Sequence, residues 1–191
     1  MKRIIALLLV FTALVTVGVG LVACSSPYSE DELIGIFKEK YEKSYALNEY
    51  IWGAGIPASE YEPNKLAYQY ELVAENADYR TKSDFIDAIK SVYVSDFVSD
   101  EINQLLFLGY GDDGPDPRYG EINGMLSINV KDTGNDNVGE GKFLPDTAVV
   151  KRARGSVAVF TVTYERDGKR SDYDLMMRLE DGEWKFEAPT Y

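Results

Sequence analysis

The last third of the chain carries the pattern that most restricts its fold. Two Asp-Gly pairs, at 167–168 and 181–182, separate stretches in which apolar and polar residues alternate. Asp-Gly favours the two-residue turn of a β-hairpin, and alternation with a period of two is typical of a half-buried strand. The pattern therefore predicts an antiparallel meander with strands over about 148–154, 156–165, 170–179 and 183–188.

The earlier part of the chain has the pattern of helices. Ser29 followed by Glu32 is a capping-box pattern, and apolar residues then recur at helical spacing as far as Trp52, where a glycine-rich segment follows. We expect a helix over about 29–52. The same reasoning predicts, in chain order, a strand over 66–74, a helix capped by Thr81 or Ser83, and a short helix capped by Ser99.

The middle of the chain reads mainly as loop. Glycine, proline and aspartate dominate 109–120, and a second polar stretch covers 132–141. Asn123-Gly124 is expected to be a turn that leads into a strand over 126–130. Because helices precede a run of hairpin-linked strands, the order favours the α+β class, with helices packed on one face of a curved antiparallel sheet.

This order of elements resembles the cone of cystatin-like and NTF2-like domains. The tail Leu179-Glu180-Asp181-Gly182-Glu183-Trp184-Lys185-Phe186 is similar to the final hairpin of many such domains. The resemblance implies one α+β domain over 29–191.

The chain begins with a separate segment. Met1-Lys2-Arg3 is followed by an uncharged apolar run from Ile4 to Leu21, and small residues then lead to Cys24, the single cysteine. The segment resembles a bacterial lipoprotein signal peptide with the lipobox Leu21-Val22-Ala23-Cys24. The resemblance implies removal of residues 1–23, acylation of Cys24, a tether over 24–28, and an extracytoplasmic protein held on the cell membrane by its acyl chains. An uncleaved membrane anchor and an ordinary secretory peptide remain as alternatives.

Composition excludes several classes of function. The chain has no histidine, which excludes Ser-His-Asp and Cys-His catalysis, His-ligated zinc and a histidine general base. The net charge of −12 becomes −14 without the leader, which contains Lys2 and Arg3 and no acidic residue. Nucleic acid is therefore not an expected partner. The acidic stretches 112–116 and 132–137 depart from the spacing of an EF-hand loop, so we expect neither a metal site nor a cofactor.

Tyrosine is in excess, at 14 of 191 residues. Tyrosine and tryptophan combine a large apolar body with a polar tip, which suits a half-wet pocket or an interface. The alternative is that the rings fill the core between helix and sheet. No catalytic residue is expected, since Asp172 and Asp174 alternate with core positions and would face solvent. The residues expected to bind a ligand or partner are Trp52, Tyr50, Tyr68, Tyr70, Tyr119 and Trp184.

A narrower resemblance concerns three segments. Asn48-Glu49-Tyr50-Ile51-Trp52-Gly53-Ala54-Gly55, Tyr79-Arg80-Thr81-Lys82-Ser83-Asp84 and Val92-Tyr93 resemble secreted inhibitors of bacterial DL-endopeptidases. The hypothesis is a lipid-anchored, extracytoplasmic binding protein without enzymatic activity, whose partner is a cell-wall hydrolase or a small ligand. The alternative is a small-molecule-binding or isomerase-like NTF2-like domain, which a buried cavity containing a carboxylate would favour.

Overall fold

The computed structural model describes residues 26–59, 69–110, 114–132, 138 and 140–191. Helices and antiparallel strands are both present, which confirms the α+β class. The elements in chain order are α2 (Glu30–Ile51), β1 (Tyr70–Leu72), α3 (Lys82–Lys90), α4 (Ser95–Phe97) with the π-helical segments Val98–Ile102 and Gln104–Leu108, β2 (Tyr119–Ile122), β3 (Met125–Asn129), β4 (Gly141–Arg154), β5 (Val157–Arg166), β6 (Lys169–Glu180) and β7 (Glu183–Phe186).

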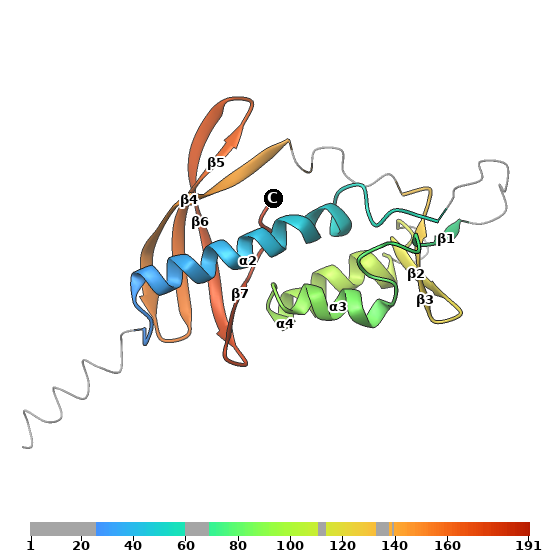
Figure 1. Cartoon of the computed structure of the whole chain (residues 1–191), viewed down its shortest axis with the longest axis horizontal. Helices are drawn as coiled ribbons and strands as arrows, with labels where there is room; N and C mark the ends of the chain where they lie inside the picture. The colour runs from blue at the N-terminus through green and yellow to red at the C-terminus, as the bar shows by residue number, and fades with distance from the viewer. Residues whose placement is uncertain (1–25, 60–68, 111–113, 133–137, 139) are drawn as a thin grey trace, which may run out of the picture.

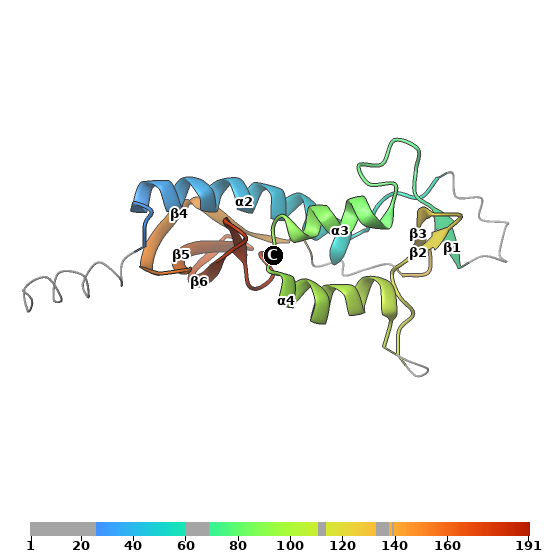
Figure 2. The same ribbon diagram turned by 90° about the horizontal axis from the view of Figure 1, so that it is seen from below.

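The strands form two separate sheets. β4, β5, β6 and β7 pair in chain order, as the hairpin turns predict, whereas β3 lies between β1 and β2 in a three-stranded sheet. The two sheets lie at opposite ends of the molecule (Figures 1 and 2). The prediction of one curved sheet was therefore wrong. Alternation identifies strands, but pairing between strands far apart in the chain has no local signal.

Helix α2 connects the two ends. The hydroxyl of Ser29 accepts a hydrogen bond from the Glu32 amide (3.3 Å) and the Glu32 carboxylate accepts one from the Ser29 amide (2.8 Å), so the capping box is confirmed. The helix has 22 residues and is therefore about 33 Å long. Near its start, Phe37 packs on Phe160 of β5 with ring centroids 4.7 Å apart. Near its end, Tyr50 meets Phe85 of α3 at 6.5 Å.

A buried polar network holds the C-terminal segment against α2. The hydroxyl of Tyr93 donates to Oδ1 of Asn48 (2.6 Å), and Nδ2 of Asn48 donates to the Thr190 hydroxyl (3.1 Å). The Thr190 hydroxyl donates in turn to that of Ser44 (2.6 Å). All four side chains are buried. Burial of so many polar atoms is tolerable because they satisfy one another.

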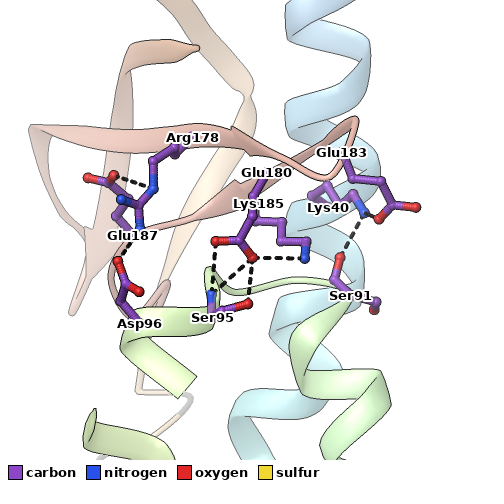
Figure 3. Close-up of polar contacts among 9 residues, drawn as sticks. All are labelled: Lys40, Ser91, Ser95, Asp96, Arg178, Glu180, Glu183, Lys185 and Glu187. Atoms are coloured by element: carbon purple, nitrogen blue, oxygen red, sulfur yellow. Dashed lines mark hydrogen bonds and ion pairs between the residues drawn. The ribbon is translucent and has the colours of Figure 1, made fainter. Parts of the chain in front are cut away.

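Ion pairs join α2 and the start of α4 to the β6–β7 hairpin (Figure 3). Nζ of Lys40 donates to the Ser91 carbonyl (2.7 Å) and to the Glu183 carboxylate (3.0 Å). The carboxylate of Glu180 accepts hydrogen bonds from the amide and the hydroxyl of Ser95 (3.1 and 2.7 Å). The remaining ion pairs are Arg178 with Asp96 (3.0 Å) and Glu187 (3.2 Å), and Lys185 with Glu180 (3.2 Å).

The sequence predicted the start of α3 correctly and the start of α4 incorrectly. Thr81 caps α3 as expected, with its hydroxyl accepting from the Asp84 amide (3.1 Å). The helix expected to start at Ser99 instead starts at Ser95, and Ser99 lies inside the following π-helical segment. The carboxylate that satisfies the first amide of α4 belongs to Glu180, 85 residues away, so no nearby residue pattern announces this helix.

The strands also differ from expectation in extent. β2 lies partly in the stretch expected to be loop, and it pairs with β3 through the turn at Asn123, whose φ is +54°. β4 starts at Gly141 rather than near 148, and register shifts interrupt its pairing with β5 between Leu144 and Val149. These irregularities break the alternation by which the strand could have been recognised. Of the strand expected over 66–74, residues 66–68 lie outside the described residues.

Candidate functional site

A cavity of about 590 Å³ lies where the end of α2 meets the three-stranded sheet. We call it the Arg118 cavity. Its wall comes from the end of α2, the second π-helical segment, the residues before β2, and the end of β3. The lining residues are Ile51, Trp52, Gln69, Leu105, Tyr110, Pro115, Asp116, Arg118, Asn129, Lys131 and Asp132.

Hydrogen bonds to backbone groups of three other segments hold Arg118 in place. Its carbonyl accepts a hydrogen bond from the amide of Asn129 (2.8 Å), and its own amide donates to the carbonyl of Leu105 (3.4 Å). The side chain is 3% exposed, and Nη2 donates to the carbonyl of Gly53 just after α2. A cation near the C-terminal end of a helix is also favoured by the helix dipole.

Gly55 makes room for this arrangement. Its φ is +86°, a conformation that residues other than glycine rarely adopt. A Cβ atom at this position would lie 2.6 Å from Cδ1 of Ile128 and 3.0 Å from Nη2 of Arg118. The loop after α2 can therefore approach the arginine only because residue 55 is glycine.

The charge of Arg118 is incompletely compensated. Among the described residues, Nε of its guanidinium has no hydrogen-bond partner, and Nη1 lies 3.7 Å from Oδ2 of Asp132, beyond hydrogen-bonding distance. A guanidinium has five N–H donors, and a buried charge is costly unless it is paired and hydrogen-bonded. An arginine of this kind on a cavity wall favours a ligand that carries an anionic group.

The other side of the cavity is apolar. Trp52 follows the last residue of α2, and its ring packs on that of Tyr191 with centroids 4.7 Å apart. Ile51 is fully buried and Leu105 is half-buried beside it. Such a surface can bury the hydrocarbon part of a ligand whose charged part faces Arg118.

Tyr50 and Tyr119 lie together behind this wall. The Tyr119 hydroxyl donates to the Tyr50 carbonyl (2.7 Å) and accepts from the Ile56 amide (2.9 Å), which ties β2 to the end of α2. Burial raises the pKa of Tyr119 to about 12. The hydroxyl of Tyr50 donates to Asp78 (2.7 Å), and this hydrogen bond raises the pKa of Tyr50 to about 12. Both tyrosines have structural contacts and neither lines the cavity.

The other predicted site residues are dispersed. The hydroxyl of Tyr70 in β1 donates to the Pro117 carbonyl (2.6 Å), next to Arg118. Tyr68 lies outside the described residues. Trp184 is 2% exposed at the other end of α2, where Tyr28 meets it edge-on at 5.8 Å. The structure therefore groups Trp52, Tyr50, Tyr70 and Tyr119 around the end of α2 and separates Trp184 from them.

Sequence patterns did not indicate Arg118 or Asn129. Arg118 lies at the end of a stretch that composition assigns to a loop, and its partner Gly53 is 65 residues away. The available signal was weak: a single basic residue just before Tyr119, in a stretch rich in aspartate.

A second feature is an aromatic surface formed by α2 and the four-stranded sheet. Tyr173 is 52% and Tyr45 40% exposed. We call Tyr45, Phe143, Tyr164 and Tyr173 the aromatic patch. The Phe143 ring meets those of Tyr164 and Tyr173 edge-on at 5.0 and 6.1 Å, and a hollow of about 340 Å³ adjoins it between α2 and β4.

Asp172 and Asp174 lie on either side of Tyr173 in β6, and both are exposed, as the sequence predicts. Their carboxylates accept hydrogen bonds from the hydroxyls of Thr163 and Thr161, both at 2.8 Å. They therefore contribute to cross-strand pairing on the solvent side of the sheet.

Comparison with known proteins identified no family model and no curated protein that matches the chain. Within the part of the chain that the structure describes, no group of three or more His, Cys, Asp or Glu side chains could hold a metal ion. No helix in that part is long and apolar enough to cross a membrane. Cys24, Asp112, Asp113 and Asp136 lie outside it.

Proposed function

We propose that this chain is a lipid-anchored, extracytoplasmic protein that binds a small molecule in the Arg118 cavity and acts by binding rather than by catalysis. The observation that carries the proposal is a buried, incompletely compensated arginine on the wall of a cavity of about 590 Å³. Ligand cavities typically have about 300–1,000 Å³ and combine an apolar wall with a few polar groups. The cavity's two carboxylates among the described residues, Asp116 and Asp132, both reach solvent, unlike the buried acid of an isomerase-like site.

The leader supports the anchoring part of the proposal. Leu21-Val22-Ala23-Cys24 matches a lipobox at each position, and Ser29 begins the first helix of the described domain only five residues after Cys24. The domain would therefore lie close to the membrane surface. We also propose that the domain has a cystatin-like or NTF2-like fold. The packing of α2 on the β4–β7 meander supports this proposal, because it is the arrangement that the resemblance implies. The three-stranded sheet is then an addition to that fold.

Fluorescence of a single tryptophan tests the binding site. The chain has two tryptophans, and Trp184→Phe leaves Trp52 on the cavity wall as the only one. Nε1 of Trp184 has no hydrogen-bond partner among the described residues, so phenylalanine should be tolerated there. We expect small anionic or zwitterionic compounds to change the Trp52 emission saturably.

The matched control is Trp52→Phe, which keeps Trp184 as the reporter at the far end of α2 and should not respond. A chemically diverse compound set that produces no saturable change in the Trp184→Phe variant, and no shift in its melting temperature, would contradict the proposed function.

A second candidate function is inhibition of cell-wall DL-endopeptidases by occlusion of their clefts. The observation that favours it is the aromatic patch, because exposed tyrosines gathered on one surface are typical of protein interfaces. The test measures inhibition of a panel of such endopeptidases by the wild-type chain and by Tyr173→Ser. We expect Tyr173→Ser to weaken inhibition, whereas Leu108→Ser, at an exposed apolar residue away from both the patch and the Arg118 cavity, should not. An absence of inhibition at micromolar excess of the wild-type chain would eliminate this candidate.

A further inference from the structure

Among the described residues of the Arg118 cavity wall, cationic and anionic side chains are equal in number. Arg118 and Lys131 are cationic, whereas Asp116 and Asp132 are anionic. The formal charges of these four described residues sum to zero, in a chain whose net charge is −12. A ligand with only negative charge would meet the two aspartates, and one with only positive charge would meet Arg118. A ligand that carries both charges avoids either repulsion.

The spacing of the charges narrows the ligand further. Nη1 of Arg118 and Oδ2 of Asp132 lie 3.7 Å apart on the same wall. At this distance the two groups attract each other without a hydrogen bond between these atoms. Within the described part of the chain the guanidinium therefore retains donors for another anion. The ligand therefore needs a cationic and an anionic group close together. The ammonium and carboxylate of an α-amino acid are attached to one carbon atom and meet this requirement.

The apolar wall adds a requirement for the rest of the ligand. Ile51, Trp52 and Leu105 face the cavity beside Arg118, and Tyr110 and Pro115 extend this surface. Aromatic and aliphatic walls favour a large apolar group, and an aromatic ring can pack on Trp52.

We propose that the cavity binds a free α-amino acid with a large apolar side chain. Its carboxylate lies against Arg118, its ammonium against Asp132, and its side chain against Trp52. The inference rests on the proposed function, because it names the ligand class of the same cavity. It makes Arg118 and Asp132 the residues that determine specificity.

Isothermal titration calorimetry on the full-length chain tests the inference with three probes. L-phenylalanine carries both charges, phenylalaninamide lacks the carboxylate, and N-acetylphenylalanine lacks the ammonium. We expect L-phenylalanine to bind at least about tenfold more tightly than either analogue, since a charge-assisted hydrogen bond is lost in each case. These ligand changes leave the protein intact, so the test does not depend on the folding of a variant.

Two variants assign the charges to residues. Asp132→Asn should weaken L-phenylalanine at least about tenfold and leave N-acetylphenylalanine unchanged, because that analogue has no ammonium to lose. The control Asp172→Asn, on the far sheet, should change neither. Arg118→Lys keeps the charge without the planar fork and should weaken L-phenylalanine but not phenylalaninamide. Its melting temperature is measured first to establish that the variant is folded.

The outcomes separate this inference from the proposed function. Equal affinity for all three probes would overturn the inference. So would a loss of affinity in Asp132→Asn that is the same for L-phenylalanine and N-acetylphenylalanine. The inference would also fail if no amino acid bound at millimolar concentration while other compounds still changed the Trp52 emission. In that case the proposed function would stand. If no compound acts on Trp52, both fail.

Discussion

The hydroxyl of Tyr93 donates a hydrogen bond of 2.6 Å to Oδ1 of Asn48, at a position where neither side chain is more than 1% exposed. The bond links Asn48 of α2 to a residue 45 positions later in the chain. Thr190 of the C-terminal segment accepts a further hydrogen bond from Asn48. A buried acceptor that loses its donor costs the full penalty of its desolvation. This contact is therefore a sensitive point of the packing around α2.

Tyr93→Phe should lower the free energy of unfolding by about 1–3 kcal/mol, because Oδ1 of Asn48 would lose this donor inside the core. Urea denaturation measures the change. The control is Tyr50→Phe, which removes a hydrogen bond to the exposed Asp78 and should cost less than about 1 kcal/mol. Equal costs for the two variants would show that the buried network does not stabilise the fold.

Gly55→Ala should destabilise the protein by more than about 2 kcal/mol. A left-handed conformation alone costs a residue other than glycine about 1–2 kcal/mol, and the new Cβ would also overlap Cδ1 of Ile128. The control is Gly155→Ala, which has a φ of +57° but nothing within 4 Å of the new atom. Denaturation of both variants separates overlap from conformation, and a smaller cost at residue 55 than at residue 155 would contradict the packing described here.

Acid should weaken the ion pair of Lys40 and Glu183. The hydrogen bond from Lys40 lowers the pKa of Glu183 below its ordinary value of 4.5, so the folded state favours the charged carboxylate. The resulting stabilisation is present above pH 4.5 and is lost as the pH falls through the lowered pKa. The stability difference between wild type and Glu183→Gln should therefore shrink as the pH falls below 4.5.

Urea titrations at several pH values between 3 and 7 measure this difference. The matched control is Glu42→Gln, at another exposed glutamate that is not part of this ion pair. A difference between wild type and Glu183→Gln that stays constant over the whole pH range would disprove the role of the ion pair.

Cys24→Ala should remove the proposed membrane anchor, since the proposed acylation takes place on the sulfur of this residue. In cell fractionation we expect the variant either in the soluble fraction or as uncleaved precursor, whereas Ser26→Ala should behave like the wild type. A Cys24→Ala protein that is both processed and membrane-bound would show that the leader is not a lipoprotein signal.

The elements that could be predicted from the sequence are those whose signals are local. Ser29 and Glu32 are three residues apart and form the predicted capping box. The turn residues Asp167 and Gly168 have φ values of +51° and +70°, as a two-residue hairpin turn of this type requires. The same holds for Asp181-Gly182, and both hairpins are present.

The features that could not be predicted depend on contacts between distant residues. Glu180 meets the first amide of α4 from 85 residues away, and Gly53 accepts the Arg118 hydrogen bond over 65 residues. Of the candidate site, Trp52 could be predicted because an aromatic residue at the end of a helix stands out in the sequence. Arg118 could not, since only the folded chain shows that it is buried.

Helix α2 packs against both ends of the molecule. Its first half covers the four-stranded sheet and its second half carries the Arg118 cavity, so neither end can open without exposing an apolar face of the same helix. A ligand bound at one end should therefore slow the exchange of backbone amide hydrogens in β5 and β6 at the other end, although it touches neither strand. Hydrogen exchange at the opposite end of the protein would then report whether the cavity is occupied.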